Sequence, residues 1–205
     1  MMQNTFTDQI ANILNNYYAE YERIFNVFDF SDNPDRFTEE NQTVNFCRAV
    51  QSVFPDAVVW YEYPFNGNDY KNRFDAVIYI PACHSLLIVE AKCLRKDSKY
   101  RAMLNDLNRI CISDNYTQIK LNGQIDTTYG IILADFWYKS GRHAYKETLN
   151  GWCETTSVEY TEKEQPFIDF RTNASTYLEN GRWDKKDFSA HHDNYHLLSL
   201  IGKIK

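Results

Sequence analysis

Two apolar stretches of sequence decide the fold of this chain: RFDAVIYI at residues 73–80 and LLIVEAK at residues 86–92. Both are rich in β-branched and large aliphatic residues, which favour strands. After Arg73 at the start of the first stretch, three more charged side chains stand where a core strand should have none: Asp75, Glu90 and Lys92. Because burying a carboxylate is costly unless it is paired or bound to a metal, we expect these residues to have a function.

The short segment between the two stretches, Pro81–His84, predicts an antiparallel hairpin. If the residues that flank this segment pair with each other, the same register places Asp75 opposite Glu90 on one face of the sheet. Side chains alternate along a strand, so Lys92 joins that face and Ala91 points to the other. Two adjacent carboxylates repel each other unless a cation lies between them, so the pattern indicates metal-assisted hydrolysis.

These residues make the sequence similar to the PD-(D/E)XK nuclease superfamily, which has the restriction-endonuclease-like fold. Its signature is an Asp at the start of one strand, then a Glu or Asp and a Lys, one residue apart, on the next. Asp75, Glu90 and Lys92 match this signature, although Phe74 stands where the family often has proline. The resemblance implies that Asp75, Glu90 and the Ala91 carbonyl bind Mg²⁺, with Mn²⁺ as a substitute. It also implies that Lys92 orients the attacking water or stabilises charge on phosphorus.

The function that the resemblance implies is metal-dependent hydrolysis of phosphodiester bonds in nucleic acid, DNA before RNA. A different class is a non-catalytic binding or regulatory module that has kept the nuclease scaffold. A third alternative is a surface hairpin in which Glu90 and Lys92 form an ordinary ion pair. The apolar run before Glu90 argues against that alternative, because it is typical of a strand covered on both faces.

The family often supplies a further metal-binding Glu from the start of a preceding helix, and here two candidates are adjacent. A helical wheel places Glu39 nearer the centre of the apolar face. The spacing from Glu40 to Thr43 is more similar to the family's pattern, so Glu40 is the predicted ligand and Glu39 the alternative. Acidic residues also favour helix N-termini without any metal, which would explain both.

The basic residues Arg95, Lys96, Lys99 and Arg101 form the densest positive run, directly after the second strand of the hairpin. We expect them to contact the phosphate backbone of nucleic acid. The alternative is a solvated entrance to a helix. The chain as a whole is acidic, with a net charge of −6, so any basic surface has to be local.

Composition predicts a folded globular protein, since 43% of the residues are hydrophobic and 16% aromatic. The sequence has no signal peptide and no apolar run long enough for a membrane span, so we expect a cytoplasmic protein with no membrane partner. The odd, scattered set of cysteines predicts free and mostly buried thiols rather than disulfides or a zinc site: Cys47, Cys83, Cys93, Cys111 and Cys153.

The pattern along the chain predicts an α/β fold with a central mixed sheet flanked by helices, a restriction-endonuclease-like core and an extra N-terminal helix. We expect residues 1–205 to form a single domain, with an N-terminal helix and linker (1–37), a nuclease-like core (38–138) and a C-terminal elaboration (139–205). The N-terminal helix is expected to pack on the main body, with a homodimer or protein-partner contact as the alternative. The predicted helices cover residues 7–28, 39–54, 99–112 and 194–203, and the predicted strands 57–63, 73–80, 86–92, 128–134, 158–161 and 167–170.

Overall fold

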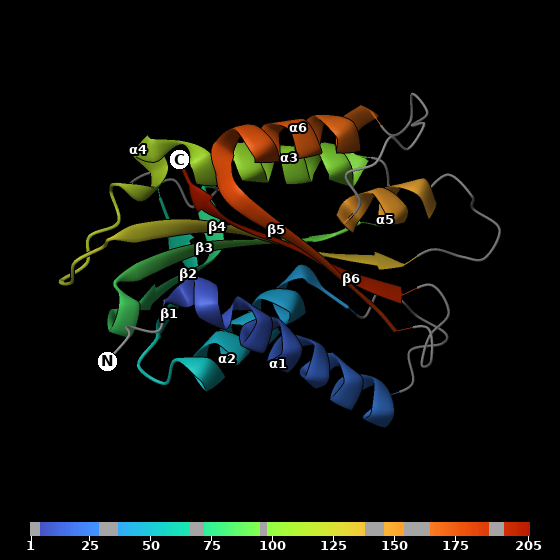
Figure 1. The fold of residues 1–205 in the computed structure, drawn as a ribbon, viewed down its shortest axis with the longest axis horizontal. Coiled ribbons are helices and arrows are strands. Elements are labelled where there is room, and N and C mark those ends of the chain that lie inside the picture. The colour runs from blue at the N-terminus through green and yellow to red at the C-terminus, as the bar shows by residue number, and fades with distance from the viewer. Residues whose placement is uncertain are drawn as a thin grey trace.

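The computed structural model of this chain describes residues 5–28, 37–65, 72–94, 98–137, 146–153, 165–188 and 195–205. Its elements are α1 (Phe6–Val27), α2 (Glu39–Val53), β1 (Val58–Pro64), β2 (Arg73–Ile80), the 3-10 turn η2 (Pro81–Cys83), β3 (Ser85–Cys93), α3 (Ser98–Cys111), α4 (Ser113–Tyr116), β4 (Thr127–Trp137), α5 (Lys146–Cys153), α6 (Gln165–Tyr177), β5 (Leu178–Asp187) and β6 (Tyr195–Ile204) (Figure 1). The predicted order of helix, three strands, helix and strand is confirmed as α2-β1-β2-β3-α3-β4, with the short α4 inserted before β4.

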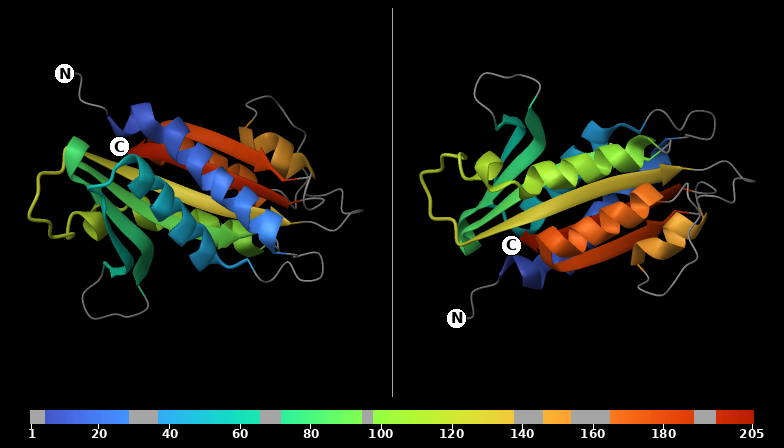
Figure 2. Two further views of the ribbon diagram at one scale, coloured as in Figure 1. Left: turned by 90° about the horizontal axis from the view of Figure 1, so that it is seen from below. Right: turned by 90° about the horizontal axis from the view of Figure 1, so that it is seen from above.

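The strands form one six-stranded sheet in the order β1-β2-β3-β4-β6-β5. β3 and β4 run parallel, whereas every other neighbouring pair is antiparallel. Helices α1 and α2 cover one face of the sheet, and α3 and α6 cover the other, which gives three layers (Figures 1 and 2). The predicted α/β class with a central mixed sheet is therefore confirmed. The strands β5 and β6, from the C-terminal part, extend the same sheet.

The sheet has a hydrophobic core on each face, and strand β3 contributes to both. Its residues Leu87 and Val89 pack in the core that contains α1 and α2. Leu86 and Ile88 pack in the core that contains α3 and α6. A strand that is buried on both faces needs apolar side chains at successive positions, which explains the unbroken apolar run before Glu90.

The N-terminal helix α1 begins with a capping box, in which Thr5 and Asp8 each bond the backbone N–H of the other. Its aromatic side chains lie against α2 and the sheet. Tyr17, for example, is fully buried and meets the ring of Phe46 edge-on, with 5.8 Å between the ring centroids. The predicted packing of this helix on the main body is confirmed.

The sequence prediction is wrong in two places in the C-terminal part. Residues 167–170, predicted as a strand, lie in α6, where Pro166 occupies the first turn, a position at which proline is tolerated. Residues 194–203, predicted as a helix, form strand β6 between β4 and β5. A short apolar run fits a buried strand as well as a buried helix, so periodicity could not decide between them. The strand predicted at residues 158–161 lies outside the described residues.

The cysteines are free thiols, as predicted. Cys47 and Cys93 are buried, Cys83 and Cys111 are partly buried, and Cys153 is exposed.

Among the residues that the structure describes, no helix is long and apolar enough to cross a membrane.

Candidate active site

The hairpin of β2 and β3 has the predicted register, with Ile80 paired to Ser85. The regular pairing ends at the pair of Ala76 and Val89, so Asp75 and Glu90 are the next residues beyond it. At that point the Asp75 side chain accepts a hydrogen bond of 2.7 Å at Oδ2 from the backbone N–H of Ala91. The structure therefore brings Asp75 next to the Glu-Ala-Lys segment on the neighbouring strand, although by a side-chain contact rather than a ladder pair.

Glu90 is the most deeply buried charged group of this cluster, with 1% of its surface exposed. Its Oε1 accepts a hydrogen bond of 3.2 Å from Nε of Arg109, and the same oxygen accepts a second one from a terminal nitrogen of that guanidinium. Within the described parts of the chain, Glu90 Oε2 has no hydrogen-bond partner. The alternative of a surface hairpin with a Glu90–Lys92 ion pair is therefore wrong, since Glu90 is buried and pairs with a helix residue.

Lys92 lies between two helices and pairs with an acidic residue from each. Its Nζ is 2.8 Å from Oδ2 of Asp106 on α3 and 3.4 Å from Oε2 of Glu39 on α2. The other oxygen of Asp106 is 2.9 Å from Arg109, one turn along α3. Asp75, Glu90 and Lys92 thus belong to a larger network of charges that also includes Asp106 and Arg109.

Sequence analysis missed Asp106 and Arg109. The signal in the sequence was the position of Asp106 directly before Leu107, on the apolar side of the predicted helix. In the structure Asp106 is only 5% exposed. A buried carboxylate at such a position requires a partner, and Arg109 follows at the i, i+3 spacing that brings side chains together on a helix. Which strand residues this pair would meet could not be inferred, because that depends on how α3 crosses the sheet.

Of the two adjacent glutamates on α2, Glu39 is the one that reaches Lys92. It also accepts a hydrogen bond of 3.2 Å from the backbone N–H of Cys93 and pairs with Lys99 at 3.1 Å. Glu40 is exposed and lies at the edge of the hollow described below. The structure therefore favours Glu39 over the predicted Glu40 as the helix residue of the site.

The remaining predicted residues of the site are placed as follows. Ala91 is fully buried, and its backbone N–H donates a hydrogen bond to Asp75. Metal binding by the Ala91 carbonyl stays a prediction. Lys99 is engaged by Glu39, and Arg101 is exposed on α3. Arg95 and Lys96 lie outside the described residues.

The charges in the cluster change the protonation of its members. Burial raises the pKa of Glu90 well above its usual value, and the nearby carboxylates of Asp75 and Asp106 raise it further. Burial also raises the pKa of Asp75. Burial would lower the pKa of Lys92, but Asp106 and the other carboxylates raise it overall, so the ammonium stays charged. The pKa values of both carboxylates therefore shift upward, as desolvation and neighbouring negative charge require.

A hollow of about 190 Å³ opens beside Asp75, between the start of α2 and the ends of β1 and β2. Its lining contains the carboxylates of Glu39, Glu40, Glu62 and Asp75. This hollow has acidic walls, lies next to the charged network and is open to solvent. It therefore suits a cation, or a ligand that binds through a cation.

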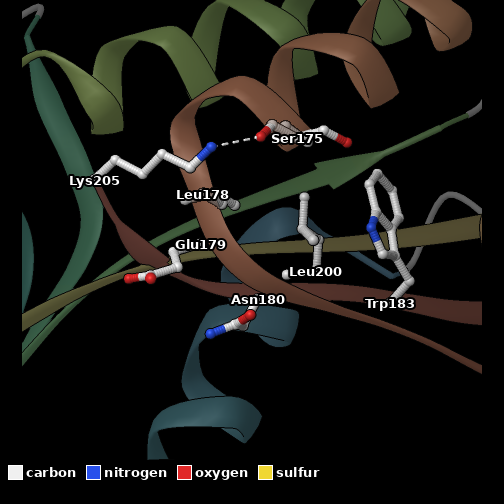
Figure 3. A pocket seen from close by; sticks show the side chains of 9 residues that line it. Ser175, Leu178, Glu179, Asn180, Trp183, Leu200 and Lys205 are labelled. Atoms are coloured by element: carbon white, nitrogen blue, oxygen red, sulfur yellow. Dashed lines mark hydrogen bonds between the residues drawn. The ribbon is translucent and has the colours of Figure 1, made fainter.

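Two further hollows lie away from this network. One, of about 340 Å³, lies where α6 meets β5 and is bordered by Trp183 and Leu200 (Figure 3). There Lys205 donates a hydrogen bond of 2.8 Å to the Ser175 carbonyl and so caps the last turn of α6. The other, of about 420 Å³, is mainly apolar and lies between β1 and residues 119–123. Asp75 and Glu90 line neither of these two hollows.

The donor set fits a hard divalent cation, which prefers carboxylate oxygens. Asp75 and Glu90 have raised pKa values, which means that the surrounding protein does not fully compensate their charge. Glu90 Oε2 is a buried acceptor without a partner among the described residues. Among the described residues, however, no group of three or more Asp, Glu, His or Cys side chains is placed to hold a metal ion.

Comparison with known proteins gives no family. No protein-family model, no curated protein and no solved structure matches this chain.

The contacts of Glu39 and Glu40 lead to a stability prediction. Burial would raise the pKa of Glu39, but Lys92 and Lys99 lower it overall, so its pairing stabilises the fold above the unfolded-state pKa near 4. Glu39→Gln is therefore expected to lower the free energy of unfolding at pH 7 by up to about 1 kcal/mol, and by less as the pH falls below about 4. Urea unfolding at pH 7 and at a pH below about 4 measures this difference in the free energy of unfolding. Glu40→Gln is the matched control, and an equal loss in that variant would show that Glu39 has no special role.

Proposed function

We propose that this chain is a metal-dependent nuclease of the PD-(D/E)XK type, which hydrolyses phosphodiester bonds of nucleic acid, DNA before RNA. The observation that supports this most is the meeting of Asp75, Glu90 and Lys92 at one place, with Glu90 buried and one of its oxygens unpaired among the described residues. The proposal includes a restriction-endonuclease-like core made of α2, β1, β2, β3, α3 and β4. The resemblance of the motif and the order of these elements support it.

Asp75 and Glu90 would hold Mg²⁺, with Glu39 as the ligand from α2 in place of Glu40. A bound Mg²⁺ or Mn²⁺ supplies a water of lowered pKa and polarises the phosphate. The burial of Glu90 keeps its oxygens from bulk water, and the Ala91 N–H fixes the orientation of Asp75. The hollow beside Asp75 is lined by Glu39 and Asp75, so a phosphate group in it would lie next to these two carboxylates.

Lys92 would act as a fixed positive charge. Burial would lower the pKa of its ammonium, but Asp106 and the other carboxylates raise it overall, which favours a fixed charge over a general base. Asp106 and Glu39 hold the ammonium from two sides. A held cation stabilises the negative charge that grows on the phosphoryl oxygens in the transition state, and it costs little reorganisation there.

The test of this function is cleavage of a mixture of single- and double-stranded DNA and RNA. We expect the purified protein to shorten DNA with Mg²⁺ or Mn²⁺ and to leave it intact with EDTA. Restoring Mg²⁺ in excess over EDTA should restore cleavage. Intact substrates under every metal condition would contradict the proposal.

The second candidate, a non-catalytic module, is favoured by the fact that Arg109 already neutralises part of the Glu90 charge. Thermal stability in Mn²⁺ separates the two. Because a ligand that binds only the folded state stabilises it by mass action, millimolar Mn²⁺ should raise the melting temperature of a metal-dependent nuclease by a few degrees. The rise should be lost in Asp75→Asn. No rise in the wild-type protein would favour the non-catalytic module.

A further inference from the structure

Arg109 holds Glu90 in an unusual way, because both of its hydrogen bonds go to the same oxygen. Nε and a terminal nitrogen both donate to Oε1, which leaves Oε2 without a partner among the described residues. A guanidinium commonly pairs with both oxygens of a carboxylate, side by side. Here one oxygen is fixed and the other is free.

Leaving the second oxygen free is costly in this position. Glu90 is 1% exposed, and a buried acceptor without a hydrogen bond loses the free energy of its hydration. Buried carboxylates in proteins are normally paired or bound to a metal. The arrangement is therefore best explained by a further group that completes the coordination of Glu90 Oε2.

Arg109 is itself held in place by two further contacts, one of them to the same terminal nitrogen that bonds Glu90. Asp106 Oδ1 lies 2.9 Å from its terminal nitrogen, and the guanidinium carbon lies 5.7 Å from the centre of the Phe65 ring. The Phe65 ring in turn stacks on Phe74 with 4.4 Å between the centroids. A cation that is fixed by a carboxylate and by an aromatic face can fix the orientation of what it binds.

We propose that Arg109 is a positioning residue of the metal site, which binds Oε1 of Glu90 so that Oε2 remains available to the divalent cation. The inference rests on the proposed function, because it assigns that cation to the same site. Asp106 belongs to the same arrangement, since it connects Arg109 with Lys92 and so links the orientation of Glu90 to that of the ammonium. Outer partners of this kind orient the ligands of metal sites in general.

Mn²⁺ affinity tests this inference without reference to cleavage. Mn²⁺ is titrated into metal-free protein and the free ion is measured by electron paramagnetic resonance. Arg109→Gln is expected to bind Mn²⁺ about 10- to 100-fold more weakly than the wild type. Arg109→Lys, which retains the charge but not the two donors to one oxygen, should recover part of the loss. Arg48→Gln, an exposed arginine on α2, is the control and should bind as the wild type does.

The outcomes separate the inference from the function on which it rests. Equal or tighter binding by Arg109→Gln would overturn the positioning role, and tighter binding would show that Arg109 competes with the metal. Weaker binding by Arg109→Gln in a protein that cleaves no nucleic acid would support the inference and reject the nuclease. A wild type that binds no Mn²⁺ would overturn both. If Arg109→Gln does not fold, Asp106→Asn tests the same arrangement, because it removes the ion pair that holds Arg109 while leaving the side chains of Arg109 and Glu90 in place. Mn²⁺ binding as tight as that of the wild type would again overturn the positioning role.

Discussion

Asp75→Asn is expected to abolish metal-dependent cleavage and at the same time to make the metal-free protein more stable at pH 7 by about 1 kcal/mol. Burial raises the pKa of Asp75. The Ala91 N–H and Lys92 oppose this rise, but the carboxylates of Asp106 and Glu39 add to it and the overall shift is upward. A carboxyl group whose pKa is raised in the folded state loses stability as the pH climbs above its unfolded-state pKa near 4. The amide of Asn has no such charge, and its oxygen can still accept the hydrogen bond from Ala91.

Urea unfolding in EDTA at pH 7 and at about pH 4 measures this effect. The advantage of Asp75→Asn should be present at pH 7 and much smaller at the lower pH, where the Asp75 carboxyl is largely protonated in the folded protein and about half protonated in the unfolded protein. Asp114→Asn, on the exposed surface of α4, is the control and should leave stability unchanged. A clear loss of stability in Asp75→Asn would mean that the carboxylate is a structural partner and that the site has to be redrawn.

Lys92→Ala is expected to slow cleavage by about 10²- to 10³-fold while the protein still binds Mn²⁺. The ammonium is a charge for the transition state rather than a metal ligand, so its removal should separate catalysis from metal binding. Lys92→Arg keeps the charge and should retain part of the activity. Because Asp106 loses one of its two partners in the Ala variant, circular dichroism must first show that the variant is folded.

Loss of Mn²⁺ binding together with activity in folded Lys92→Ala would contradict this division of roles. Undiminished cleavage in Lys92→Ala would indicate that another protein in the preparation cuts the substrate.

The hairpin could be predicted from sequence because a short connection fixes its register, and the register alone brings Asp75 to the strand of Glu90. The order of elements up to β4 could be predicted for a related reason, since each has a clear periodic pattern. The strand β6 could not, because a run such as His196–Ile201 is too short to distinguish a strand from a helix when both of its faces are buried.

The charged partners of the site illustrate the same limit. Glu39 and Glu40 differ by one position on a helix, and only the packing of α2 against the end of β3 decides which of them reaches Lys92. Asp106 and Arg109 contact the hairpin through tertiary structure alone, from a helix that follows it in sequence. Local patterns contain no information on such contacts.

The most direct test of the central claim is the initial rate of DNA cleavage in Mg²⁺ by matched preparations of the wild type and Glu90→Gln. Glutamine has the size of glutamate and can accept the hydrogen bonds of Arg109, so the fold should persist. Only the charge of the buried carboxylate is removed. We expect cleavage to fall by more than about 100-fold, the upper range for loss of a mere outer partner of a metal site. A folded Glu90→Gln protein that cleaves DNA at the wild-type rate would show that this cluster is not the site of hydrolysis.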